Sequence, residues 1–137
     1  MIMPSKELTR NQRLVLDALA TAGKPQSAYT VLDALRDEGF RAPLQVYRAL
    51  DRLIERGFVH RLESVNSFVT CAHPHEHEHG MVAFAICDQC GSADEFSDDM
   101  VEQRLKDWAL ASHFRLAQSI IELRGVCEMC QGGAANS

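Results

Sequence analysis

The spacing of apolar positions before residue 57 predicts three helices. Apolar side chains return every three or four residues through three segments, at about 11–22, 28–38 and 43–56. A glycine follows each segment and provides a stop, at Gly23, Gly39 and Gly57. Ser27 is a suitable N-cap for the second segment, and Pro43 is tolerated in the first turn of the third.

After Gly57 the apolar pattern changes from helical to strand-like. Residues 58–62 and 68–71 are rich in β-forming side chains and flank a turn-like stretch, 63–67. Three helices followed by a hairpin is the order of a winged helix. If the hairpin is centred between residues 65 and 66, His60 lies directly across from Cys71. Two side chains that commonly bind metals then meet at the base of the wing.

The third predicted helix has two different faces. One is apolar and must pack on the other helices, through Val46, Ala49, Leu50, Leu53 and Ile54. The other carries Gln45, Tyr47 and three arginines at intervals of four, Arg48, Arg52 and Arg56. Arginines on such a face suit phosphate contacts and guanine recognition in a major groove. The alternative is an ordinary solvated face, partly neutralised by Asp51 and Glu55.

The pattern beyond residue 80 predicts a small α/β unit. Strands are expected near 82–86 and 93–96, an amphipathic helix over about 100–111, and a further strand over 114–123. The residues after 131 are expected to be a disordered tail. We therefore predict an α+β chain with a winged-helix DNA-binding domain (1–71), a histidine-rich hinge (72–80), a dimerisation and metal-binding domain (81–131) and a disordered tail (132–137).

Four of the five cysteines form two CxxC pairs, Cys87 with Cys90 and Cys127 with Cys130. Two thiolates separated by two residues can bind one tetrahedral ion, and two such pairs complete a zinc site. Redox dithiols or unliganded thiols are weaker alternatives in a reducing compartment. We predict that this site is structural and joins the last segment of the chain to the α/β unit.

Between the two halves, histidines alternate with other residues from His73 to His79, two glutamates among them. This composition suits borderline metals, zinc above all. The alternative is a hydrated linker that binds metals only incidentally.

Charge is distributed unevenly along the chain. Residues 1–70 carry ten Lys or Arg and eight Asp or Glu, whereas residues 71–137 carry four and eleven. This asymmetry favours a nucleic-acid-facing first half in a chain whose net charge is −5; the alternative is ordinary surface charge that is uneven by chance. No apolar run approaches the roughly 20 residues that cross a bilayer, and no signal peptide is recognisable, so we expect a cytoplasmic protein without a membrane partner.

The motifs together resemble the ferric uptake regulator family and, within it, the zinc uptake regulators. The resemblance extends over residues 8–130. Its most specific stretches, by order and spacing, are 27–29, 46–51, 57–64, 68–71, 86–91 and 121–127.

The resemblance implies a homodimer that binds double-stranded operator DNA and represses zinc-uptake genes when zinc is plentiful. It implies two Zn²⁺ per chain: a structural ion on the four CxxC cysteines, and a regulatory ion on His60, Cys71, a linker histidine and Glu95. It also implies that Tyr47 and Arg48 read bases and that Tyr29 contacts the DNA backbone. The linker ligand in zinc regulators precedes the first CxxC by about seven residues. Gly80 stands there in this chain, so His79 is our choice and His77 its competitor.

Other functions remain as alternatives. A sensor of iron, manganese, nickel or peroxide on the same scaffold is the nearest, although a thiolate such as Cys71 favours zinc. A zinc-buffering protein would leave the arginine face unexplained. A zinc deaminase needs His-x-Glu and Pro-Cys-x-x-Cys, and neither occurs, so we expect no enzyme and no small-molecule substrate.

Overall fold

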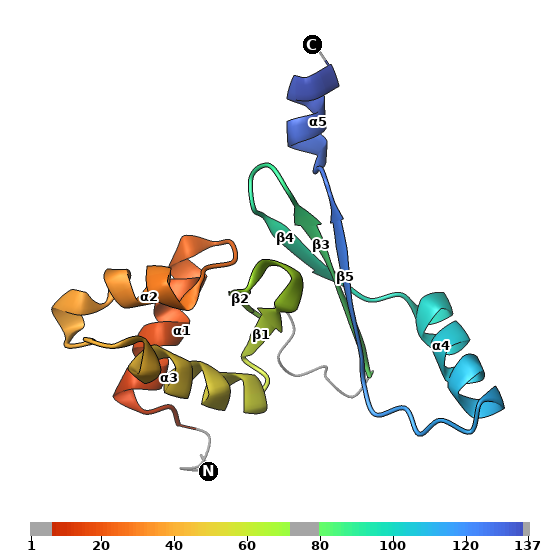
Figure 1. The fold of residues 1–137 in the computed structure, drawn as a ribbon, viewed down its shortest axis with the longest axis horizontal. Coiled ribbons are helices and arrows are strands. Elements are labelled where there is room, and N and C mark those ends of the chain that lie inside the picture. Colours follow the sequence, from red (N-terminus) through yellow and green to blue (C-terminus); the bar gives the residue numbers. More distant parts are fainter. Residues whose placement is uncertain (1–6, 72–79, 136–137) are drawn as a thin grey trace. The chain divides into compact units, whose positions relative to one another are not determined.

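The computed structural model describes residues 7–71 and 80–135 (Figure 1). The chain forms two compact units, residues 1–74 and 75–137. Within the described ranges, no helix is long and apolar enough to cross a membrane.

Over its described residues, 7–71, the first unit contains three α-helices and a two-stranded hairpin, in the order that the sequence predicts. Its elements are α1 (Arg10–Ala22), α2 (Ala28–Ala34), η2 (Arg36–Glu38), α3 (Pro43–Glu55), β1 (Val59–Leu62), η3 (Glu63–Val65) and β2 (Ser67–Thr70). The chain thus has a winged-helix unit before its histidine-rich segment.

The predicted helix boundaries arise from local capping. Thr9 and Gln12 form a capping box at the start of α1, in which each side chain accepts the backbone N–H of the other residue. Gly23 ends α1 in the left-handed conformation, with φ of 72°. Ser27 caps α2 by accepting the N–H of Thr30 at 3.1 Å.

The second helix ends earlier than predicted. Regular α-helix stops at Ala34, and a 3₁₀ turn continues the chain to Glu38. The N–H of Phe40 then donates to the carbonyl of Leu35 at 3.3 Å, so the chain folds back on the helix end. This turn brings Phe40 into the core, where it is 2% exposed. Tertiary burial therefore overrides continuation of the helix.

One hydrophobic core joins the three helices to the hairpin. Its most buried members include Val15, Leu19, Val31, Val46, Leu50, Leu53, Val59 and Phe68. The predicted apolar face of α3 is confirmed, with Ile54 only partly buried. Backbone hydrogen bonds of 2.8 and 2.9 Å join Gln26 to Phe68 and fix the hairpin beside the start of α2.

The predicted pairing of His60 with Cys71 is wrong. The hairpin places His60 opposite Val69, and its last pair is Leu62 with Ser67. The difference arises at the turn. The 3₁₀ turn η3 is followed by Asn66 at φ of 50°, so that the second strand begins at Ser67, one residue earlier than predicted. Cys71 donates its N–H to Phe58 instead, at 2.8 Å. Val69, the residue opposite His60, lies two positions before Cys71, and side chains two positions apart on a strand share a face. Cys71 therefore stays on the same face of the hairpin as His60.

Residues 80–135 of the second unit form a three-stranded sheet with a helix in the crossover between two parallel strands. Its elements are β3 (Met81–Cys87), β4 (Ala93–Phe96), α4 (Asp99–Ala111), β5 (Ser119–Gly125) and α5 (Glu128–Ala135). The strand order is β4-β3-β5, with β4 antiparallel and β5 parallel to β3. In Figure 1, α4 lies in the connection between β4 and β5. The carboxyl ends of β3 and β5 therefore meet at one edge of the sheet.

The last predicted strand begins later than expected. Regular strand starts at Ser119, not at Phe114. His113 leaves α4 at φ of 56°, and Phe114 returns its N–H to Ala109 at 2.7 Å. The Phe114 ring then packs on Trp108, with centroids 5.6 Å apart. Contact with the helix thus holds Phe114 away from the strand.

The carboxyl-terminal region also differs from the prediction. Helix α5 extends to Ala135, across residues that we expect to be a disordered tail. The helix begins within the second CxxC pair, where the N–H of Gln131 donates to the carbonyl of Cys127 at 2.9 Å. Sequence propensity did not indicate this extension, because it runs through Gly132 and Gly133 and glycine is a poor helix former.

Candidate metal centre and nucleic-acid interface

The four CxxC cysteines come together at the shared carboxyl edge of β3 and β5. Cys87 ends β3 and Cys90 lies in the turn after it; Cys127 follows β5 and Cys130 lies in α5. Their sulfur atoms all lie within 4.8 Å of one another. The two parallel strands therefore deliver both ligand pairs to the same place, as the spacing predicts.

The sulfur geometry fits a tetrahedral zinc ion. The Sγ atoms of Cys87 and Cys130 are 3.7 Å apart, and those of Cys90 and Cys127 are 3.8 Å apart. Zinc–sulfur bonds of about 2.3 Å place the sulfurs of a regular tetrahedron about 3.8 Å from each other. The arrangement thus matches the size of the ion, and the donor set of four thiols matches its chemistry.

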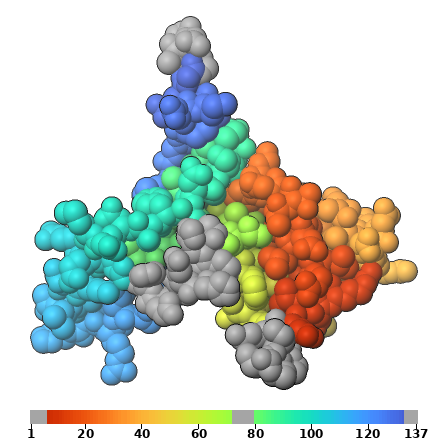
Figure 2. Space-filling model, turned by 180° about the vertical axis from the view of Figure 1, so that it is seen from behind, coloured from red at the N-terminus to blue at the C-terminus, as the bar shows by residue number. Residues whose placement is uncertain are grey.

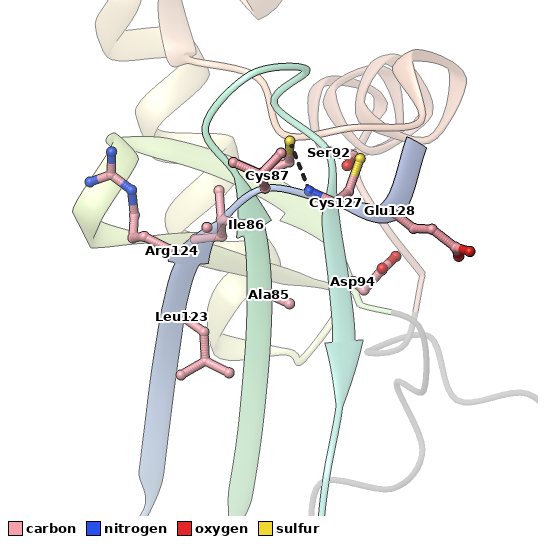
Figure 3. Close-up of a pocket in the computed structure, with 11 residues that line it drawn as sticks. Ala85, Ile86, Cys87, Ser92, Asp94, Leu123, Arg124, Cys127 and Glu128 are labelled. Carbon is pink, nitrogen blue, oxygen red and sulfur yellow. Dashed lines mark hydrogen bonds between the residues drawn. The ribbon is translucent and has the colours of Figure 1, made fainter. Parts of the chain in front are cut away.

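Backbone groups prepare Cys87 to act as a thiolate. Its Sγ accepts the N–H groups of Cys90, Cys127 and Gln89, each at 3.4 Å. The first two of these bonds are the main reason why the pKa of Cys87 falls from 9.0 to about 6. Figure 3 shows the bond from Cys127, which links the second ligand pair to the first.

Neighbouring groups shift the pKa values of Cys90 and Cys130 in opposite directions. The Ser92 hydroxyl, 3.2 Å from the Sγ of Cys90, lowers the pKa of that thiol. The Cys127 and Cys87 thiols raise the pKa of Cys130 to about 12, because it shares hydrogen bonds with both. Four thiolates this close repel one another unless a cation lies among them.

A pocket of about 240 Å³ opens beside this cluster. Cys87 and Cys127 line it together with side chains such as Ser92, Asp94 and Glu128 (Figure 3). The cluster is therefore open to solvent on one side, which gives a metal ion a path of entry.

The hairpin of the first unit holds two of the predicted regulatory ligands. His60 lies on β1 and Cys71 directly follows β2. An imidazole nitrogen of His60 and the Sγ of Cys71 lie within 4.8 Å of each other, so one ion can contact both. Their shared face, not direct pairing, brings them together.

The remaining predicted regulatory ligands lie beyond this hairpin. Glu95 is on β4, opposite Phe84 of β3, and its side chain is partly exposed. His77 and His79 lie outside the described residues. The four-ligand site stays a prediction.

The predicted DNA-contacting arginines, two on α3 and Arg56 at its C-cap, have three different surroundings. Arg48 is exposed and makes no hydrogen bond or ion pair with any described residue. Arg52 pairs with Glu55 at 3.1 Å. Arg56 donates to the carbonyl of Glu7 at 3.2 Å, and its guanidinium lies 5.8 Å from the centre of the Phe58 ring.

The two tyrosines that are predicted to contact DNA, Tyr47 and Tyr29, also differ in their surroundings. Tyr47 packs edge-on against Phe68, with ring centroids 6.3 Å apart. Tyr29, near the start of α2, is 62% exposed. Tyr47 is thereby held in place by the wing, whereas Tyr29 has most of its surface available.

Comparison with known proteins assigns this arrangement to a family. The model of the ferric uptake regulator family matches residues 6–124. The chain belongs to the ferric uptake regulator family. The zinc uptake regulation protein of Escherichia coli K12, a relative, is 40% identical over 124 residues, which are 90% of this chain and 72% of the relative.

Two solved structures are similar to this chain over both of its units. A zinc uptake regulator complexed with zinc and DNA has a TM-score of 0.89 at 38% identity, covering 96% of this chain and 88% of that one. The holo form of XcZur has a TM-score of 0.82 at 45% identity, covering 92% and 87%. The α+β fold, with a DNA-binding domain before a second domain, is thus confirmed.

Sequence reasoning missed two features of the cysteine site. Ser92 contacts Cys90, and the signal was only a hydroxyl two residues beyond a ligand. An ion pair of 2.7 Å joins Asp88 to Arg124, from the two segments that carry the ligands. Adjacency of β3 and β5 could have predicted that pair, but their parallel register is not readable from spacing alone.

Proposed function

We propose that the chain is a zinc-responsive repressor that binds the operators of zinc-uptake genes as a homodimer. The observation that carries this proposal is a winged helix whose hairpin holds His60 and Cys71 within reach of one ion. Its similarity to proteins named as zinc uptake regulators supports zinc as that ion. The same proposal implies that the protein regulates transcription and does not catalyse a reaction. It also implies that the protein acts in the cytoplasm, where the operator lies.

The proposed protein holds two zinc ions per chain. The four CxxC cysteines hold a structural ion that fixes α5 to the sheet edge, since two ligands come from each side of the crossover. His60, Cys71, His79 and Glu95 hold the regulatory ion, with His77 as the competing linker ligand. A thiolate among these ligands favours zinc over iron or manganese.

Signalling follows from where the proposed regulatory ligands lie in the sequence. His60 and Cys71 belong to the winged helix, and Glu95 belongs to the second unit. When all four ligands share one ion, the DNA-binding unit is tied to the rest of its protomer. The two heads of a dimer then match half-sites one helical turn apart, roughly 34 Å. The extent of the switch depends on the difference in zinc affinity between matching and non-matching arrangements.

We propose that α3 enters the major groove. Arg48 and Tyr47 read bases, while Arg52, Arg56 and Tyr29 contact the phosphate backbone. The exposure of Arg48 supports its role, because no described partner must be displaced. Arg52 would exchange Glu55 for phosphate, at little cost for a pair about two-thirds exposed on each side.

The apolar surface of the second unit supports dimerisation through it. Large side chains stay uncovered on α4 and β5, among them Met100, Trp108, Leu110, Ile120 and Leu123. The surface of α4, cyan in Figure 2, is open to view in the space-filling picture. Monomeric proteins rarely leave so many large apolar side chains in contact with water, and a second copy of the chain would cover them.

The decisive test is operator binding by wild type and Cys71→Ser at a series of buffered free zinc concentrations. Cys71→Ser removes a regulatory ligand and leaves all four structural cysteines, so a folded dimer should remain that no longer binds in response to zinc. His60→Ala and Glu95→Ala should behave alike. His79→Ala should also abolish the response to zinc, unless His77 replaces the lost ligand; in that case the response should be weakened and not lost. Wild-type zinc dependence in Cys71→Ser would refute the regulatory site.

A further inference from the structure

An ion pair between Asp88 and Arg124 connects the two segments that carry the zinc ligands. Asp88 directly follows Cys87, and Arg124 precedes Cys127 by three residues. The Nε of Arg124 donates to Oδ1 of Asp88 at 2.7 Å, a short charge-assisted hydrogen bond. The pair lies outside the ligand set, and the proposed function does not use it.

Main-chain contacts surround this pair. The N–H of Asp88 donates to the carbonyl of Gly125 at 2.7 Å, beside the last residue pair of the parallel strands, Cys87 with Gly125. The N–H of Cys127 donates to the Sγ of Cys87 at 3.4 Å. Side chain, main chain and ligand thus join the same two segments within a few residues.

Charge gives the ion pair a second effect. A zinc ion bound by four thiolates carries a net charge of −2, and Asp88 adds a further negative charge next to one of the ligands. Arg124 neutralises that charge at 2.7 Å. Without Arg124, the Asp88 carboxylate would repel the anionic zinc site. This repulsion would be stronger than in bulk water, because the dielectric constant near a protein surface is lower.

We propose that Asp88 and Arg124 are positioning residues that hold the two CxxC pairs together and slow the release of the structural zinc. This inference rests on the proposed structural zinc site. Groups that orient metal ligands typically change metal affinity by about 10- to 100-fold. Half-exposed ion pairs contribute less than buried ones, so Arg124→Ala should speed release about three- to tenfold.

The electrostatic argument also predicts an order among the variants. Arg124→Ala leaves Asp88 unpaired beside the anionic centre, whereas Asp88→Asn leaves a positive arginine near it. Arg124→Ala should therefore release zinc faster than Asp88→Asn. Because the two residues act through one contact, the effects of the single changes should not add in the double variant. Arg124→Lys keeps the charge and should recover part of the wild-type rate.

The experiment follows zinc transfer from the full-length chain to an excess of the chromophoric chelator 4-(2-pyridylazo)resorcinol. A Cys71→Ser background removes one ligand of the proposed regulatory site, so that slow release reports the four cysteines. Arg104→Ala is the matched control, because Arg104 is exposed in the same unit and makes no hydrogen bond or ion pair with a described residue. Thermal unfolding of the zinc-loaded proteins separates a change in release from a general loss of stability.

Faster release in Arg124→Ala, with wild-type release in Arg104→Ala and the order given above, supports the inference. Equal release rates in wild type and Arg124→Ala overturn it while leaving the zinc site intact. Equal rates in Arg124→Ala and Arg104→Ala, both faster than wild type, also overturn it. A wild-type chain that holds no zinc on its cysteines overturns both the inference and the proposed structural site. If Arg124→Ala does not fold, Asp88→Asn and Arg124→Lys decide by the same comparison.

Discussion

Replacing Arg48 by alanine tests the proposed reading of DNA most directly. Arg48 is exposed on α3 and has no hydrogen-bonding or ionic partner among the described residues, while its neighbours Val46 and Ala49 face the core. Alanine is also the best helix former. The variant should therefore stay folded, and any loss of DNA binding reports the missing contact.

The expected loss follows from the number of recognition helices. A bidentate arginine–guanine contact contributes about 1–3 kcal/mol of discrimination. A dimer presents two copies of α3, so Arg48→Ala should weaken operator binding by about 2–6 kcal/mol, at least roughly 30-fold. Arg52→Ala should behave differently, because a phosphate contact carries no sequence information. Losing one such contact per protomer should reduce the slope of log affinity against log salt by about 2.

Fluorescence anisotropy at saturating zinc can measure both effects. The operator would be selected from random DNA, and variants of it would replace each guanine in turn. Affinities at about 50 to 200 mM salt give the slope. Arg104→Ala removes the same charge from the second unit and serves as the control.

Two results would contradict the reasoning. If Arg48→Ala retains wild-type affinity and sequence preference, α3 does not read bases through this residue. If it weakens every sequence equally and lowers the salt slope, Arg48 contacts phosphate instead.

Three further predictions concern the metal site and the core. Cys130→Ser should lose one zinc per chain by elemental analysis and lose the dimer or the fold; a stable dimer with unchanged zinc contradicts a structural role. Phe68→Ala should lower the free energy of unfolding by about 3–5 kcal/mol in urea, because Phe68 is 2% exposed, whereas Leu44→Ala at 56% exposure should change it little. In zinc-free protein at pH 7, iodoacetamide should modify Cys90, which is exposed and has a lowered pKa, before Cys130, with a pKa of about 12; equal alkylation of the two thiols contradicts this. Since folding lowers the pKa of Cys87 from 9.0, its contribution to the stability of the zinc-free protein is complete above about pH 9 and is lost as the pH falls through about 6, which urea unfolding at a series of pH values measures.

Local signals in the sequence predicted the elements that depend on local physics. Ser27 caps α2, and Gly23 adopts the left-handed conformation after α1, because both effects involve neighbouring backbone groups. The four-cysteine cluster was also predictable, since each CxxC pair already brings two ligands together. These features need no knowledge of distant contacts.

The predictions that failed depend on contacts between distant residues or on turn geometry. Phe40 and Phe114 both end or delay a regular element because each ring packs elsewhere, and periodicity does not show where. His60 was assigned the wrong partner because Asn66 adopts a left-handed conformation that shortens the loop. A hairpin register follows from the turn, and several turns fit the same residues.

The parallel pairing of β3 and β5 makes the zinc site sensitive to strand register. Each strand ends beside one ligand pair, so a slip by one residue would displace Cys127 by about 3.3 Å relative to Cys87. That displacement is comparable to the 3.7 Å between the sulfurs of Cys87 and Cys130, and it would open the tetrahedron. Slipped pairings of the sheet would therefore bind zinc poorly. Among the alignments open to the folding chain, the ion favours the native one, so zinc supply during folding bears on how much of the protein is correctly assembled.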